Sequence, residues 1–110
     1  MAEAPLSVDV DESAERMLIG VSGELDLATA PTLRAAMEKA AKTNVPVVRV
    51  DLADLSFLDS SGISVLVEAR SALDQRGCPL VLHRVNDRIA RVLEVAGLKG
   101  FFETSDQPAE

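Results

Sequence analysis

The sequence predicts an α/β fold, a small mixed β-sheet of four to five strands covered by about three helices. Segment 45–52 is a strongly apolar, β-branched run, whereas three other segments repeat apolar residues at helical spacing. Strand and helix patterns alternate through most of the 110 residues, a length that suits one domain. We place this domain at residues 6–103 and expect residues 1–5 and 104–110 to be flexible.

The first elements are expected to be two strands and a helix. Segment 6–10 alternates apolar and polar residues, and an apolar stretch follows at 17–22, which together predict a hairpin. Thr29 can cap the helix, and Pro31 suits its first turn, because the amide that proline lacks has no helical partner there. The inner face of this helix is formed by Leu33, Ala36, Met37, Ala40 and Ala41.

The centre of the sheet is expected at segment 45–52. This segment is too apolar to leave either face in water, as in a central strand of a sheet covered by helices. Pro46 must lie at its very start, because proline cannot donate to the sheet ladder. A second helix follows, and Gly77 is well placed to end it. The inner face of the second helix is formed by Gly62, Val65, Leu66, Ala69, Ala72 and Leu73.

The last third of the chain repeats the order of strand, helix and strand. Residues 79–83 indicate another buried strand, and Asn86 can cap a third helix that Gly97 ends. We expect Phe101 and Phe102 to start a last short strand. The inner face of the third helix is formed by Ile89, Val92, Leu93 and Ala96.

Composition and charge exclude several classes of function. The chain carries 11 Lys and Arg against 18 Asp and Glu, a formal charge of −7, and it has no Trp or Tyr. We therefore expect no binding to nucleic acids or anionic membranes, which need basic residues and, for single strands, aromatic stacking platforms. The single Cys78 cannot form an internal disulfide, and with one histidine it cannot form a structural zinc site. With no signal peptide or membrane-spanning run, we expect a cytoplasmic protein without a metal or cofactor.

The segment most informative about function is 55–62, with the sequence LSFLDSSG. It links the apolar strand to the second helix, so its polar residues should lie at a helix N-terminus on the rim of the sheet. Two interpretations stay open. Asp59, Ser60 and Ser61 could merely cap the helix, although one of them suffices. Alternatively, Gly62 lets another backbone come close, and two adjacent hydroxyls at the positive end of a helix could hold a phosphate.

No arrangement of residues indicates an enzyme. His83 is the only histidine, and it suits a rim or packing position better than a catalytic one, because no nucleophile motif lies beside it. A serine hydrolase triad needs a Gly-x-Ser-x-Gly motif, which the sequence lacks. Asp59 as an aspartyl-phosphate site would need an acidic metal-binding pair and a facing lysine, and we find no convincing lysine for that role.

Several motifs resemble those of one protein family. They are 23–26 (GELD) followed by Thr29 and Ala30, 51–52 (DL) leading into 57–62 (FLDSSG), and 95–98 (VAGL). Together they resemble the STAS-domain anti-sigma-factor antagonists of bacteria, also called anti-anti-sigma factors. The resemblance runs from about Leu6 to Glu103 and implies the STAS fold for the predicted sheet and helices.

The resemblance also implies a switch and its partners. In that family the first serine of the Asp-Ser-Ser-Gly segment is phosphorylated by an anti-sigma factor that is itself an ATP-dependent kinase. Ser60 is then the phosphoacceptor, the unphosphorylated chain binds the kinase and frees the sigma factor, and a serine phosphatase resets the switch. The partner-binding residues so implied are Asp26, Asp59, Ser60, Ser61, Gly62 and Ile63. Asp26 has a second, equally open interpretation as a turn-forming residue.

A function of a different class also stays open. The chain could be a STAS-type accessory or scaffold subunit of a transporter or a stress-signalling complex, in which the serine is structural. Phosphate incorporation into Ser60 by a kinase separates the two functions. A small hydrolase is a distant third, which turnover of ester substrates would revive. We expect the free protein to be a monomer and not an enzyme.

Overall fold

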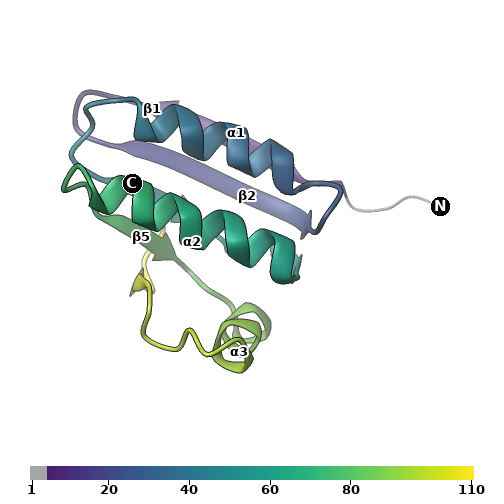
Figure 1. Cartoon of the computed structure of the whole chain (residues 1–110). Helices are drawn as coiled ribbons and strands as arrows, with labels where there is room; N and C mark the ends of the chain where they lie inside the picture. The colour runs from purple at the N-terminus through teal and green to yellow at the C-terminus, as the bar shows by residue number, and fades with distance from the viewer. Residues whose placement is uncertain (1–4) are drawn as a thin grey trace.

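Six strands and three helices form the structure, a computed structural model that describes residues 5–110 (Figure 1). The strands are β1 (Ser7–Glu12), β2 (Met17–Leu25), β3 (Val48–Asp51), β4 (Leu55–Leu58), β5 (Leu80–His83) and β6 (Glu103–Ser105). The helices are α1 (Ala30–Ala41), α2 (Ser60–Asp74) and α3 (Asp87–Val95). The predicted α/β class is confirmed. Of the expected flexible N-terminus, residues 1–4 lie outside the described residues.

The long strand β2 organises the sheet. β1 pairs with it antiparallel, as the predicted hairpin requires, over Ser7–Glu12 against Met17–Ser22. On the other side of β2, its first half pairs in parallel with β3 and its second half pairs in parallel with β4. β5 and β6 continue the sheet in parallel beyond β3. The sheet therefore has six strands rather than four to five, because residues 55–58, which we expected to be a connection, extend it along β2.

Helices α1 and α2 lie side by side over one face of the sheet, and α3 lies apart from them near β4 (Figure 1). The sheet residues beneath α1 and α2 include Met17, Ile19, Val48, Val50 and Leu82, which are all 0% exposed. The helices contribute their predicted inner faces, with Leu33, Leu66 and Ile89 also 0% exposed. Two small residues, Ala72 and Ala96, were predicted to face inward and are exposed instead, because they lie at the margins of their helices.

The opposite face of the sheet is polar, which differs from the expectation for segment 45–52. Arg49 and Asp51 alternate with the buried valines of β3 and are only half-buried. They lie beside His83 and Arg84 at the end of β5. Arg49 contacts the His83 ring, and Asp51 accepts hydrogen bonds from Arg84. The strand is central in the sheet, as predicted, but its second face carries charged groups.

Three sequence signals concern the starts of α1 and α3, and the structure agrees with two of them. The Asn86 side chain accepts from the Ile89 N–H at 2.9 Å and caps α3, and Pro31 lies in the first turn of α1. Thr29 occupies the N-cap position of α1, but its side chain forms no cap hydrogen bond. Its hydroxyl instead donates to the Glu24 carbonyl at 2.8 Å, because the preceding loop offers an acceptor.

The C-terminal segment contacts the ends of β3 and β5. Residues 104 and 105 belong to β6, which begins at Glu103 rather than at Phe101. Beyond it, the Gln107 carbonyl lies 2.8 Å from the His83 Nδ1, and the Ala109 N–H donates to Asp51 at 3.2 Å. These two contacts join the segment to β5 and β3, and the flexibility of residues 104–110 stays a prediction. Within residues 5–110, no helix has the length and apolar character needed to cross a membrane.

Candidate functional site

The candidate site forms where β2 and β4 end. These strands are parallel, with Leu25 opposite Leu58, so the segments that follow them emerge at the same edge of the sheet. The Asp59 N–H donates to the Leu25 carbonyl at 3.2 Å and joins the two segments. The turn 26–29 and the start of α2 are therefore neighbours, and these two segments contain all the site residues that the resemblance implied.

Asp59 alone caps α2. Its backbone is extended, and its Oδ1 accepts from the Ser61 N–H at 2.9 Å and the Gly62 N–H at 3.3 Å. The Ile63 N–H donates to the Asp59 carbonyl at 3.0 Å. The hydroxyls of Ser60 and Ser61 are thus not needed for capping, and Ser60 is exposed. Because Asp59 already occupies these amides, the helix end is not the open phosphate cradle that the sequence suggested.

Gly62 is a point of close approach in the core beneath the site. A Cβ at this position would lie 2.5 Å from the Leu25 Cγ and 2.6 Å from the Leu58 Cδ1. We predicted that another backbone approaches here, but the groups that come close are leucine side chains. Gly62 itself is buried, and Ile63 is half-buried and packed against the core. Of residues 60–63, Ser60 is therefore the one exposed to a partner.

Asp26 fixes the neighbouring turn. Its Oδ1 accepts from the Thr29 N–H at 3.0 Å, and its N–H donates to the Thr29 hydroxyl at 2.9 Å. This geometry agrees with the interpretation of Asp26 as a turn-forming residue. Its contact with a partner stays a prediction.

The surface around Ser60 is acidic and partly apolar. Among residues 5–110, the carboxylates of Glu24, Asp26 and Asp59 take no part in an ion pair. Two large apolar side chains are exposed at the same edge, Leu27 in the turn and Phe57 in β4. The sequence motifs give Leu27 no role. The sequence feature that could have indicated Leu27 is an apolar residue inside a turn, where polar residues are usual.

The remaining candidates lie away from this edge or are structural. The His83 side chain is 3% exposed, with its Nε2 at 3.2 Å from an Arg49 guanidinium nitrogen, so it is a packing residue. Cys78 is buried, as expected of a small apolar residue. The part of the chain that the structure describes contains no cluster of three or more His, Cys, Asp or Glu suited to a metal ion.

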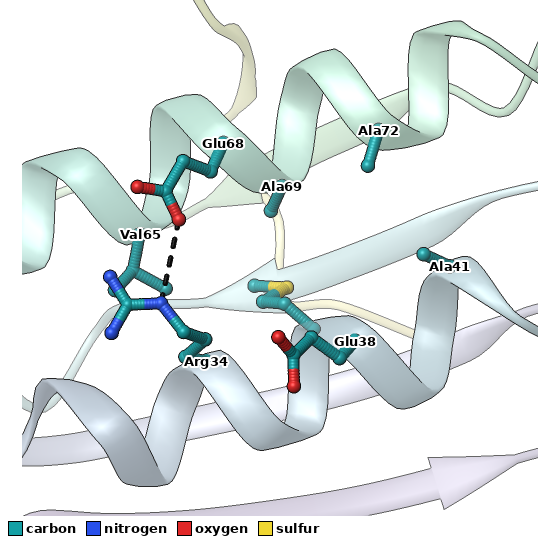
Figure 2. Close-up of a pocket in the computed structure, with 8 residues that line it drawn as sticks. Arg34, Glu38, Ala41, Val65, Glu68, Ala69 and Ala72 are labelled. Atoms are coloured by element: carbon teal, nitrogen blue, oxygen red, sulfur yellow. Dashed lines mark hydrogen bonds and ion pairs between the residues drawn. The ribbon is translucent and has the colours of Figure 1, made fainter.

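A shallow pocket lies between α1 and α2 (Figure 2). Arg34 and Glu68 join the two helices across it, with the Arg34 Nε at 3.4 Å from a Glu68 carboxylate oxygen. Val65 and Ala69 line its floor. The volume of about 190 Å³ is below the roughly 300–1,000 Å³ that is usual for small-molecule sites. The pocket is therefore a helix-packing groove.

Comparisons with known proteins agree with the fold and the motifs. The family described as Mlab, STAS domain, matches residues 8–103. The anti-sigma-B factor antagonist of Listeria monocytogenes is 35% identical over 106 residues, which cover 96% of this chain and 93% of that protein.

Among solved structures, unphosphorylated SpoIIAA, an anti-sigma factor antagonist, superposes with a TM-score of 0.78 at 21% identity, covering 92% of this chain and 90% of that one. The phosphorylated form of SpoIIAA from Bacillus gives a TM-score of 0.72 at 21% identity, covering 92% and 93% of the two chains. These structures share the fold. From the family match and the Listeria relative, the chain belongs to the STAS-domain family of anti-sigma factor antagonists.

Proposed function

We propose that the chain binds an anti-sigma serine kinase when Ser60 is unphosphorylated, frees the sigma factor, and is switched off by phosphorylation of Ser60. The observation that carries this proposal is the exposed Ser60 beside a carboxylate that already caps α2. The name of the Listeria relative and the two SpoIIAA structures, one of them phosphorylated, support it. A serine phosphatase resets the switch, and the chain acts as a cytoplasmic regulator without catalysis of its own.

The switch works through local charge. A phosphate on Ser60 adds about −1.5 to −2 charges next to Asp59, whose carboxylate holds the first amides of α2. A kinase must bring the phosphates of its nucleotide to the Ser60 hydroxyl, so a phosphate on Ser60 meets like charge on the partner. Like charges about 4 Å apart repel by roughly 4 kcal/mol at an effective dielectric constant of 20, and solvent and salt reduce that figure. A remainder of about 1.4 kcal/mol changes affinity tenfold. A partner can therefore be released without refolding of the chain.

The proposal is tested by phosphorylation in vitro. The purified chain is incubated with ATP and each anti-sigma serine kinase encoded in the same genome, and its intact mass is measured. We expect one phosphate on the parent, one on Ser61→Ala, and none on Ser60→Ala. Ser60→Ala should still bind the kinase, because it adds no charge and Asp59 still caps the helix. Phosphate on Ser60→Ala equal to that on the parent would show that Ser60 is not the acceptor.

Calorimetry then tests the effect of charge. We expect Ser60→Asp to weaken kinase binding by roughly tenfold, because aspartate brings one negative charge where a phosphate brings nearly two. Equal affinities of the parent and Ser60→Asp would mean that charge at this site does not control binding. The chain would then fit better as an accessory subunit in which the serine is structural.

A further inference from the structure

Leu27 is a large apolar side chain that the fold leaves in water. It is 76% exposed, in the turn between β2 and α1. The hydrogen bonds that shape this turn join Asp26 and Thr29 and do not involve the Leu27 side chain. The turn therefore does not need a leucine here, and the fold gains little from it.

Leu27 lies near Ser60. It is two residues beyond Leu25, whose carbonyl accepts from Asp59, the neighbour of Ser60. Two Cα–Cα steps of about 3.8 Å lead from Leu25 to Leu27, and one such step leads from Asp59 to Ser60. One protein interface, which covers roughly 800 Å² on each partner, is large enough to include both residues.

Phe57 adds a second exposed apolar group to this edge. It is 45% exposed and lies opposite Glu24 in the pairing of β2 with β4. It comes three residues before Ser60 in the chain. Each of the two segments beside Ser60 therefore exposes one large apolar side chain. In many protein interfaces a few side chains that become buried in the partner's pockets supply most of the affinity.

The charge around these side chains restricts the partner. The carboxylates of Glu24, Asp26 and Asp59 lack ion pairs within residues 5–110, and the whole chain carries a formal charge of −7. A second copy of this acidic surface and an anionic membrane would both be repelled. A protein with basic groups around an apolar pocket is complementary to it.

We propose that Leu27 is the main apolar anchor of this chain on its kinase, with Phe57 as a second contact on the other side of Ser60. The kinase receives Leu27 in an apolar pocket bordered by basic side chains. This proposal rests on the proposed function. The turn after β2 then supplies much of the affinity for the kinase, and phosphorylation of Ser60 controls that affinity.

The test compares Leu27→Ala with Val95→Ala. Val95 is a matched control, because it is 79% exposed and lies on α3. The kinase used is the one that phosphorylates the parent. We expect Leu27→Ala to raise the Kd for this kinase, and the KM for phosphorylation of Ser60, at least tenfold. The kcat should be unchanged when the variant is present at a saturating concentration. Phe57→Ala should raise Kd by a smaller factor, and Val95→Ala should stay within twofold of the parent. Equal urea midpoints of Leu27→Ala and the parent confirm that the variant is folded.

Each outcome has one interpretation. If the kinase binds and phosphorylates the parent and Leu27→Ala equally well, Leu27 is not the anchor, and the proposed function stands. If no anti-sigma serine kinase binds or phosphorylates the parent, the proposed function is wrong and the anchor is wrong with it. If size-exclusion chromatography shows a dimer of the parent that Leu27→Ala dissociates, with kinase affinity unchanged, the occupant is a second copy and the proposal is overturned.

Discussion

On the face of the sheet beneath α1 and α2, side chains such as Met17, Ile19 and Val50 are 0% exposed and belong to one apolar cluster. On the opposite face, Asp51 is the centre of a polar cluster. It accepts from the Arg84 guanidinium at 2.8 Å and from two backbone amides, one of them in the C-terminal segment. Apolar burial does not depend on pH, whereas a hydrogen-bonded carboxylate contributes only while it is ionised. The two faces should therefore respond differently to mutation and to acid.

The backbone of Arg84 supports the polar cluster. Its φ of 52° lies in the left-handed region, which is uncommon for residues other than glycine. Its N–H donates to the Ser105 carbonyl at 2.8 Å, while its side chain reaches Asp51. The turn that ends β5 is thus held both by β6 and by β3.

The largest expected effect is on the apolar face. Leu66 is 0% exposed on the inner face of α2, so Leu66→Ala should lower the free energy of unfolding by about 2–5 kcal/mol through lost burial and a residual cavity. Glu68→Ala is the control on the same helix, because its side chain is 61% exposed and its ion pair with Arg34 is at the surface. It should change stability by less than about 0.5 kcal/mol. Urea unfolding measures both, and a greater loss in Glu68→Ala would contradict the packing of α2.

A smaller loss is expected where α2 meets the ends of β2 and β4. In Gly62→Ala the new methyl group would lie 2.5 Å from Leu25 and 2.6 Å from Leu58, so these side chains must move. Overpacking of this kind costs about 1–3 kcal/mol. Gly20→Ala is the control, because a Cβ there meets nothing within 4 Å. If thermal unfolding shows equal stability for the two variants, the contact at Gly62 is not tight.

The same contrast explains which features the sequence could predict. Helical periodicity placed Leu33, Leu66 and Ile89 in the core, because this pattern is local and each helix buries one face. The strand β4 was missed because it has only four residues, and its pairing depends on the length of β2. The contacts of Gln107 and Ala109 could not be predicted, because they depend on His83 and Asp51, which lie far away in the sequence.

The candidate site also has features that the sequence predicts and features that it does not. The position of residues 59–62 at a helix N-terminus followed from local signals. The choice of Asp59 over the two serines as the cap did not, because all three residue types cap helices. Nor did the sequence show that Asp59 occupies the first amides of α2 and leaves Ser60 exposed. The phosphorylation proposal depends on this detail.

The smallest expected effect is on the polar face, and it depends on pH. Burial raises the pKa of the Asp51 carboxyl, but hydrogen bonds from Arg84, Ala53 and Ala109 and the charge of Arg84 outweigh burial, so the pKa lies below its ordinary value of 3.8. Asp51 therefore stabilises the fold above that ordinary value, and this stability is lost as the pH falls through the lowered pKa. Asp51→Asn should cost about 1 kcal/mol at pH 7, a modest loss because the Arg84 side chain is 44% exposed to screening solvent.

Urea unfolding of the parent and Asp51→Asn between pH 2 and pH 7 measures this contribution. The difference in unfolding free energy should be constant from pH 7 to about pH 5, and it should shrink below pH 4, because protonated Asp51 resembles asparagine. Asp11→Asn is the control, since Asp11 also pairs with an arginine, Arg16, but its side chain is 71% exposed. Its difference from the parent should stay below about 0.5 kcal/mol throughout. A difference for Asp51→Asn that grows as the pH falls would mean that burial outweighs the hydrogen bonds, and that the carboxylate opposes folding on this face of the sheet.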